Sequence, residues 1–408
     1  MQYKNRLIED KIADLFLEYP VVAVLGAKQA GKSTLVENLF PEAGTFVFDS
    51  VFEGEGGQRH PEFFLNNYKI PAFFDDVHQA PELLSSIMEQ AECENKKSLY
   101  LLSGFQGQET LERIKAMLPD RVGVAQLWSM SHREISGDTG PGFLESWLGG
   151  HEFDPQTWAD KKRESTNSRI WHGGYPKILE LPDALLPSYW QSYLHTYVER
   201  DVCGFFHINF LEKFNSFMEK LSALSGQEPN FNQLGRELDV NRKTILRWYD
   251  ILVATYQWIK VPAFNRNPAK QIISKVKGYA SDTGFACYLQ RIATPEMIET
   301  HPMAEKLFET HVVLEIIKNL QKLPMDWNIY HFRSYTGASV DLVLEVNGGL
   351  YPIAIQANDK PFRKDVRSFS SFRECFPNEK IHQGLIVSNM EKPKRLSDSI
   401  VAIPWWLI

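Results

Sequence analysis

A stretch near the N-terminus, VVAVLGAKQAGKSTL at residues 21–35, has the residue types and spacing of a phosphate-binding loop. Gly26, Gly31, Lys32 and Ser33 fit the pattern G-x-x-x-x-G-K-S. The glycines let the backbone curl until its N–H groups point at an anion, and the following helix turns its positive end to the same anion. In a nucleotide triphosphatase, this lysine reaches the β- and γ-phosphates and this hydroxyl ligates Mg²⁺. The residues expected to bind the nucleotide are Gly26, Ala27, Lys28, Gln29, Ala30, Gly31, Lys32, Ser33 and Thr34.

The remaining parts of such a site are expected after two other apolar runs. Asp75 suits the metal side, and Asp76 is placed to activate water. The alternative is that this acidic pair only caps the helix expected from Pro81. Ser103 and Gln106 follow the next apolar run and are candidates for sensing the γ-phosphate, although a plain turn at a strand end explains them as well.

Short apolar runs alternate with amphipathic segments through the first 130 residues or so. Strands are expected at 21–25, 45–48, 70–74, 98–102 and 122–128, and helices at 4–18, from 32 onward and at 81–91. This alternation predicts an α/β domain, a three-layer P-loop fold with a parallel sheet and helices on both faces. Ligands of such sheets bind at the carboxyl ends of the strands, where the phosphate loop, Asp75 and Ser103 fall.

The second half of the chain has a different pattern. A boundary or inserted loop is expected at 136–165, and a helical, aromatic-rich region at 183–222. Residues 231–252 are typical of a helix–turn–helix, and 253–280 suit a β wing. The last elements expected are a helix at 303–321 and strands at 329–333, 339–346, 350–356 and 385–388, with a turn at Asn347-Gly348.

Composition limits the classes of protein that fit. A chain of 408 residues suits two or three domains, and its net charge of −7 argues against a protein that coats nucleic acid. The charge is uneven, because residues 236–277 carry nine basic and three acidic side chains, a local pattern that favours a polyanionic partner. Four widely spaced cysteines indicate a reducing compartment, and no apolar run reaches the length of a membrane span, so a cytoplasmic location is expected.

Six segments give the sequence a specific resemblance. In order they are GAKQAGKST, FFDDVHQAPELL, LLSGFQ, DRVGVAQLWSMSHREI, WHGGYP and YLHTYVERDV. This series resembles the prokaryotic AAA-type P-loop ATPases that join an ATPase core to a C-terminal domain of unknown function. Over nearly the whole chain, the resemblance implies an ATPase domain with a helical extension at 1–210, a winged-helix domain at 211–290 and a small α/β restriction-endonuclease-like domain at 291–408. The DTG at 282–284, the helix FETHVVLEI and the strands VDLVLEV and YPIAIQA match the last two parts.

The acidic pair departs from the family pattern. The family has Asp-Glu where this chain has Asp75-Asp76. Because aspartate is one methylene shorter, its carboxylate falls short by roughly 1 Å, a displacement that costs on the order of a hundredfold in rate. Slow turnover is therefore expected, with ATP acting as a switch.

The nuclease-like part departs as well. Metal-dependent nucleases of this type need an Asp, then Glu-x-Lys on the next strand. Asp341 is present, but the next strand has Ala354 and Gln356, while Glu309 and Glu345 do not obviously replace both missing groups. We expect a nuclease-like fold that is catalytically degraded, and Asp341 is equally explained as a surface carboxylate at a strand end.

Two sets of basic residues are further candidates. The resemblance places a catalytic arginine at Arg121, with Arg133 and Arg200 as alternatives, although each also suits a structural ion pair. On the second helix of the helix–turn–helix, Arg242 and Lys243 are placed to meet DNA bases and Arg247 to meet phosphate. The apolar residues of the same helix are equally consistent with a helix that only packs against protein.

These observations predict an ATP-binding protein with slow or regulated Mg²⁺-dependent hydrolysis, coupled to C-terminal domains that bind nucleic acid or protein. The alternatives are a DNA-binding regulatory module that uses ATP as a switch, and a nuclease-like protein whose activity ATP controls. ATP is favoured over GTP because the guanine-reading N-K-x-D stretch is absent. A catalytic arginine supplied by a neighbouring subunit would require a homo-oligomer.

Overall fold

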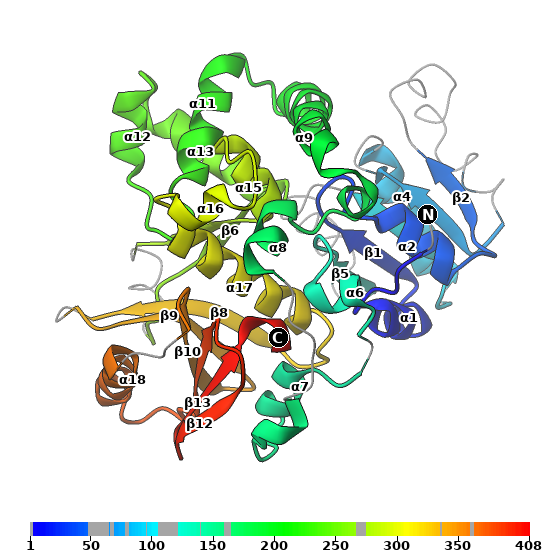
Figure 1. Cartoon of the computed structure of the whole chain (residues 1–408). Coiled ribbons are helices and arrows are strands. Elements are labelled where there is room, and N and C mark those ends of the chain that lie inside the picture. The colour runs from blue at the N-terminus through cyan, green and yellow to red at the C-terminus, as the bar shows by residue number, and fades with distance from the viewer. Residues whose placement is uncertain are drawn as a thin grey trace. The chain divides into compact units, whose positions relative to one another are not determined.

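The computed structural model describes residues 3–47, 65, 69–77, 81–94, 96–104, 121–138, 140–158, 165–266, 275–334, 337–359 and 363–408 (Figure 1). The chain forms two compact units. The first contains Met1–Met130, Tyr175–Glu180 and Tyr249–Gln257. The second contains Ser131–Gly174, Leu181–Trp248 and Trp258–Ile408. Within the described ranges, no helix has the length and apolar character that crossing a membrane requires.

The first unit is built on a five-stranded parallel sheet in the order β2-β3-β4-β1-β5. Its strands are β1 (Val21–Leu25), β2 (Gly44–Val47), β3 (Ala72–Asp75), β4 (Tyr100–Gly104) and β5 (Val122–Gln126). Its main helices are α1 (Glu9–Glu18), α2 (Lys32–Leu39) and α4 (Pro81–Glu94). The parallel sheet predicted from the alternating pattern is thus confirmed.

Both faces of this sheet are covered, which explains why every residue of β1 is buried. On one face, Leu101 belongs to an apolar core with Ile12 of α1 and Leu35 of α2. Successive side chains of a strand point to opposite faces, so Tyr100 lies on the other face. There its hydroxyl donates a hydrogen bond of 2.5 Å to Gln90 of α4.

The second unit begins with a helical region. Its elements are α6 (His132–Ser136), α7 (Phe143–Leu148), η3 (Pro155–Trp158), α8 (Thr166–His172), η5 (Asp183–Leu185), α9 (Leu186–Tyr193), the π-helix η6 (Leu194–Val202), α10 (Cys203–Phe205), α11 (Leu211–Ser222), α15 (Thr283–Leu289) and α16 (Met297–Thr300). The aromatic-rich helices predicted at 183–222 are present. The π-helix was not predicted, because its wider turn leaves no distinct spacing in the sequence.

The WHGGYP and DTG segments hold this region together. The backbone N–H of Gly174 donates to Asp282 Oδ2 at 2.8 Å, and Asp282 also caps α15 by accepting from the N–H of Gly284 at 2.9 Å. Gly173 has a φ of +71°, and a Cβ there would lie 2.1 Å from Asp282 Oδ1. These residues therefore have a structural role in joining two distant segments of the chain.

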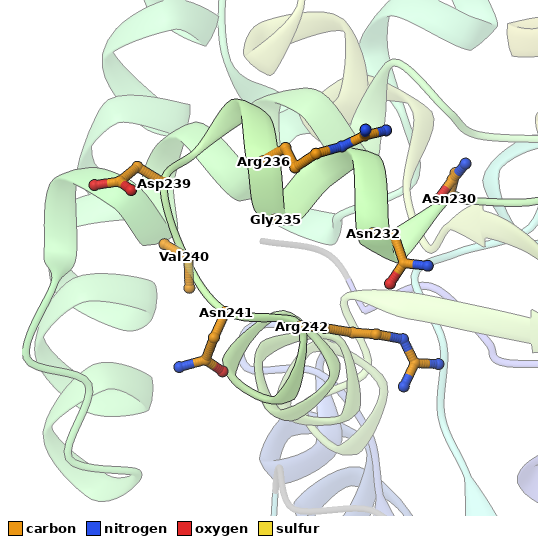
Figure 2. Close-up of a pocket in the computed structure, with 8 residues that line it drawn as sticks. All are labelled: Asn230, Asn232, Gly235, Arg236, Asp239, Val240, Asn241 and Arg242. Atoms are coloured by element: carbon orange, nitrogen blue, oxygen red, sulfur yellow. The ribbon is translucent and has the colours of Figure 1, made fainter.

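Two helices joined by a tight turn, α12 (Phe231–Glu237) and α13 (Arg242–Ala254), form the predicted helix–turn–helix (Figure 2). A Cβ on Gly235 would lie 2.7 Å from the carbonyl oxygen of Val240, so the turn requires glycine there. Asn230 caps α12 by accepting from the N–H of Gln233 at 3.1 Å. Two antiparallel strands follow, β6 (Trp258–Val261) and β7 (Lys277–Ala280).

The C-terminal part of the second unit is a mixed sheet in the order β12-β13-β11-β10-β9-β8. Its elements are α17 (Ala304–Leu320), β8 (Trp327–Arg333), β9 (Ser339–Val346), β10 (Gly349–Gln356), α18 (Arg363–Cys375), β11 (Gly384–Ser388), β12 (Lys394–Ser397), β13 (Ile400–Pro404) and η7 (Trp405–Leu407). Asn347 and Gly348 have φ values of 48° and 76°, which gives the β9–β10 hairpin the predicted turn. Among the later elements, α18, β12 and β13 were not predicted.

Candidate nucleotide-binding site

The phosphate loop connects β1 to α2 in the first unit. A Cβ on Gly26 would lie 2.1 Å from the backbone oxygen of Leu127, so no other residue fits without moving the chain. Gln29 and Gly31 both have left-handed backbone conformations, with φ values of 66° and 97°. Left-handed residues placed between other backbone conformations turn successive N–H groups toward one point, which is a binding geometry for anions.

Lys32 is buried at the start of α2 and lies against the loop that precedes it. Its Nζ donates to the carbonyl oxygens of Gly26 at 3.1 Å and Ala27 at 3.0 Å. Burial lowers the pKa of Lys32 from its ordinary value, while the carboxylates of Asp76 and Asp75 oppose this change. The loop thus holds a positively charged group beside its N–H groups, as binding of a polyphosphate requires.

Asp75 ends β3 and joins three polar groups at the carboxyl edge of the sheet. The Ser33 hydroxyl donates to Asp75 Oδ2 at 2.5 Å, and the Ser103 hydroxyl donates to Asp75 Oδ1. The N–H of Asp76 lies 3.1 Å from Asp75 Oδ1 and 3.3 Å from Ser103 Oγ. The structure therefore brings Lys32, Ser33, Asp75, Asp76 and Ser103 together, as their positions at strand ends predicted.

The donor set of this site fits Mg²⁺. This ion takes one or two carboxylates together with phosphate oxygens and water, and it prefers oxygen ligands. Ser33 and Asp75 supply a hydroxyl and a carboxylate from adjacent elements, already in contact. No group of three or more His, Cys, Asp or Glu side chains suited to a metal occurs in the described part of the chain, which a site of this kind does not need.

Arg6, which the sequence did not reveal as a site residue, lies against the phosphate loop. It precedes α1, its side chain is buried, and its guanidinium donates to the carbonyl oxygens of Ala30 at 2.9 Å and Trp128 at 2.7 Å. One side chain thereby connects the loop to the segment that follows β5. A single arginine outside any motif has no spacing that could have identified it.

The candidate arginines lie elsewhere. Arg121 precedes β5, where the parallel register pairs Val122 with Val21, so it lies at the edge of the sheet opposite the phosphate loop. Its guanidinium donates to the carbonyl oxygens of Ala91 at 3.1 Å and Glu92 at 3.4 Å, near the end of α4. Arg200 is exposed and pairs with Asp201 at 2.7 Å. Gln106 lies outside the described residues.

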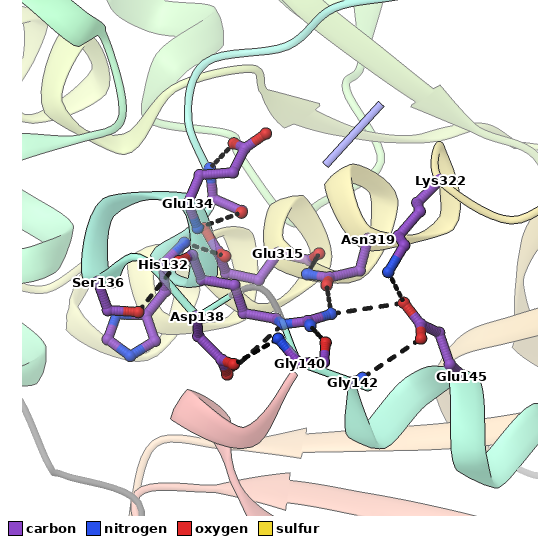
Figure 3. A network of polar contacts seen from close by, with 12 residues as sticks. His132, Glu134, Ser136, Asp138, Gly140, Gly142, Glu145, Glu315, Asn319 and Lys322 are labelled. Carbon is purple, nitrogen blue, oxygen red and sulfur yellow. Dashed lines mark hydrogen bonds and ion pairs between the residues drawn. The ribbon is translucent and has the colours of Figure 1, made fainter. Parts of the chain in front are cut away.

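Arg133 belongs to a polar network in the second unit. Figure 3 shows its partners Asp138, Glu145 and Asn319. Its guanidinium donates to Asn319 Oδ1 at 3.2 Å and to the carbonyl oxygen of Gly140, and it lies 3.8 Å from Asp138 and 3.6 Å from Glu145. The side chain is almost completely buried. Arg133 thus joins the segment around α6 and α7 to α17, as the structural alternative predicted.

Two acidic residues considered in the sequence analysis, Glu309 and Asp341, form what we call the ionic cluster together with Lys277 and Lys306. Lys277 donates to Glu309 Oε1 and lies 3.8 Å from Asp341, and Lys306 donates to Glu309 Oε2 at 2.7 Å. The N–H of Ile355 donates to Asp341 Oδ2 at 2.9 Å. The sequence did not identify Lys277 as a member, because it lies 32 positions before Glu309, on β7. Ala354, which stands where an acid was expected, is buried in the apolar core.

A glycine-rich loop between a buried parallel strand and a helix, with Lys32 beside it and Asp75 at a neighbouring strand end, defines a P-loop nucleotide-binding domain. The family models agree with this class. Residues 18–136 match the AAA domain, which implies ATP binding. Residues 163–296 match a domain of unknown function (DUF8612), and residues 304–408 match another (DUF4143). The chain therefore contains an AAA domain at residues 18–136, followed by two domains of unknown function.

Solved structures with partial similarity include the Walker-type ATPase PABY2304 of Pyrococcus abyssi, which is 12% identical in sequence. The match covers 71% of this chain and 96% of that chain, with a TM-score of 0.39. The Thermotoga maritima RuvB Holliday junction branch migration motor has 16% identity, covers 67% of this chain and 96% of its own, and has a TM-score of 0.32. At these scores the similarities carry no functional argument. No curated protein sequence matches the chain.

Proposed function

We propose that this protein binds ATP, hydrolyses it slowly or under regulation with Mg²⁺, and couples its nucleotide state to C-terminal domains that bind nucleic acid or protein. The observation that carries this proposal is the contact of Ser33 with Asp75 beside the buried Lys32. These groups come from α2 and β3, and they supply a hydroxyl, a carboxylate and an ammonium at one edge of the sheet. Phosphoryl transfer depends mainly on such positioning of charge.

Each residue has a separate role in this proposal. Lys32 and the N–H groups of residues 26–34 bind the phosphates, Ser33 and Asp75 hold Mg²⁺, and Asp76 orients and deprotonates water. When bound, Mg²⁺ would neutralise negative charge on the phosphates. Gln106 stays a proposed sensor of the γ-phosphate.

The residue type at position 76 is the basis for proposing slow turnover. The φ of Asp76, 54°, is left-handed, a conformation that aspartate tolerates better than most residues. Its carboxylate is one methylene shorter than the glutamate expected there, which increases the distance to an attacking water. We propose that this short side chain keeps hydrolysis slow, so that the bound nucleotide acts as a timed signal.

Arg121 is proposed to complete the site of a neighbouring subunit in a homo-oligomer. Support comes from its place at the edge of the sheet opposite the phosphate loop of its own chain. Because it is far from that loop, a catalytic role would have to be in the site of a neighbouring subunit. Its contact with the end of α4 also allows a purely structural role, because cations stabilise helix C-termini.

The experiment is a measurement of ATP affinity and phosphate release with Mg²⁺ for wild type, Lys32→Ala and Asp76→Glu. We expect binding with slow release in wild type, loss of affinity by at least about a hundredfold in Lys32→Ala, and faster release in Asp76→Glu. The matched control is Lys97→Ala, which removes an exposed lysine paired with Glu18. Turnover that Lys32→Ala leaves unchanged would contradict the proposal.

The alternative function, a DNA-binding regulatory module, is favoured by the helix–turn–helix and the two-stranded sheet after it. We propose that residues 211–290 are a winged-helix domain and that residues 291–408 have a nuclease-like fold without cleavage activity, next to an ATPase domain at 1–210. The ionic cluster supports the loss of cleavage, because both oxygens of Glu309 already accept hydrogen bonds from lysines.

A further inference from the structure

The basic region at 236–277 contains two kinds of cation in the structure. Some are neutralised: Arg266 pairs with Glu345 at 2.8 Å and with Glu379, Lys275 lies 3.6 Å from Glu228, and Lys277 is in the ionic cluster. Arg236, Arg242 and Lys243 differ, because they are exposed and their side chains make no hydrogen bond or ion pair with the described residues. Among the cations of the region that the structure describes, these three exposed ones all lie on the helix–turn–helix.

Two of these cations line an open pocket of about 800 Å³ between α12 and α13. We call it the two-helix pocket, and its lining residues are Asn230, Asn232, Gly235, Arg236, Asp239, Val240, Asn241 and Arg242. Figure 2 shows Arg236, Asn230, Asn232 and Arg242 extending toward the same side of the two helices, whereas Asp239 lies at the opposite end. Asp239 is also compensated by Lys213 at 3.2 Å.

We infer that the two-helix pocket binds the phosphodiester backbone of duplex DNA, with Arg236 on α12 and Arg242 on α13 holding phosphates from two sides. Guanidinium groups bind phosphate oxygens in pairs of parallel hydrogen bonds, and asparagine amides are common neutral donors to the same oxygens. Asn230 uses its side-chain oxygen to cap α12, which leaves its NH₂ group to donate. A helix–turn–helix approaches duplex DNA with both helices, which suits a pocket between them.

This inference changes the residue set expected from the sequence. Arg247 was expected to bind phosphate, but its Nη2 donates to the carbonyl oxygen of Phe206 at 2.6 Å, which gives it a structural partner. Arg236 takes that place, although it lies on the first helix rather than the second. The inference rests on the proposed coupling of ATP to a nucleic-acid-binding domain, and it specifies the partner and its contacts.

The test is binding of a fluorescently labelled 20-base-pair duplex to the full chain, followed by anisotropy at several salt concentrations. Each phosphate contact adds about 0.9 to the slope of log affinity against log salt. We expect Arg236→Ala and Arg242→Ala each to weaken binding by about three- to tenfold and to reduce the slope by about one, independently of DNA sequence. The matched control is Arg333→Ala, an exposed arginine on β8.

The outcomes separate this inference from the proposed function. The inference is supported if the wild-type protein binds DNA and the pocket variants bind it more weakly. Lys32→Ala, measured without nucleotide, should bind DNA as the wild type does. If the protein binds ATP but not DNA, the inference is overturned and the proposed ATP site stands. If it binds DNA but not ATP, the inference stands and the proposed ATP site is overturned. Equal losses in Arg333→Ala, or binding to polyglutamate in place of DNA, also overturn the inference. Thermal unfolding of each variant identifies losses caused by misfolding, in which case Arg236→Gln and Arg242→Gln provide the deciding measurement.

Discussion

The phosphate loop and the ionic cluster contain the same kinds of residue in different electrostatic states. Each has a buried lysine with two carboxylates near it. In the loop, Lys32 is held by backbone carbonyl oxygens, and Asp75 accepts hydrogen bonds from neutral hydroxyls. In the cluster, Lys277 and Lys306 bind directly to Glu309. Residue type alone therefore does not define an ion-binding site, because what matters is whether the charges are already compensated.

This difference has an energetic meaning. Buried charges that pair with one another recover much of their desolvation cost within the fold. A buried lysine held by neutral groups recovers less, and burial accordingly lowers the pKa of Lys32. The phosphate loop thus retains part of the desolvation free energy of Lys32, which a bound anion would reduce. In the ionic cluster, the charges already compensate one another without a ligand. Three predictions test this contrast.

The largest effect is expected from Glu309→Ala. This change leaves Lys277 and Lys306 without their shared carboxylate, and removing one partner of a buried ion pair costs about 3–5 kcal/mol. Urea unfolding should show the loss in the second unit while ATP affinity stays unchanged. The control is Lys277→Met with Glu309→Leu, which removes both members of the more buried pair and leaves only the partly exposed Lys306 without its partner, so it should recover most of the stability. If Glu309→Ala costs less than about 1 kcal/mol, the cluster is solvated and the comparison fails.

A smaller, pH-dependent effect is expected from Asp341→Asn. Burial and the neighbouring Glu309 raise the pKa of Asp341 from 3.8 to about 6. A carboxyl group with a raised pKa in the folded state favours folding at low pH, and this contribution is lost as the pH rises through about 6. The asparagine variant should therefore be more stable than wild type by about 3 kcal/mol at pH 7.5 and should match it near pH 4.

The check on this second prediction is urea unfolding at both pH values, with Asp326→Asn as the control for an exposed carboxylate in the same unit. A stability difference that does not change with pH would mean that Asp341 has the same pKa in the folded and unfolded states. The carboxylate would then carry no cost of burial in the ionic cluster, and this prediction would be wrong.

The sequence was sufficient for features that depend on local pattern. The phosphate loop and the parallel strands were predictable, because a fixed spacing and alternating apolar runs encode them. The same is true of the Asn347-Gly348 turn, whose left-handed backbone needs these residue types. Strands β12 and β13 were missed, since the last segment of the chain combines an exposed strand of polar residues with a short apolar one.

Features that depend on tertiary contact were not predictable. Lys277 places a positive charge beside Glu309 and 3.8 Å from Asp341, but it comes from a strand far away in the sequence. The basic count at 236–277 overestimated the free charge, because Arg266 and Lys275 have acidic partners from other segments. Sequence analysis detects which charges are present, whereas only the fold determines which of them are compensated.

The smallest effect is expected from Arg6→Ala, which tests whether the phosphate loop depends on support from outside its motif. Arg6 donates to Ala30 in the loop and to Trp128 after β5, so its loss leaves two carbonyl oxygens without these bonds. The loop should become less ordered, and ATP affinity should fall by about tenfold, or about 1.4 kcal/mol. Arg6→Lys keeps the charge but donates from a single nitrogen, so it should recover only part of the affinity. Isothermal titration calorimetry on both variants provides the measurement. Wild-type affinity in Arg6→Ala would show that the glycines and Lys32 alone maintain the loop. The residues of the motif would then hold the buried charge of Lys32 in place without support from outside.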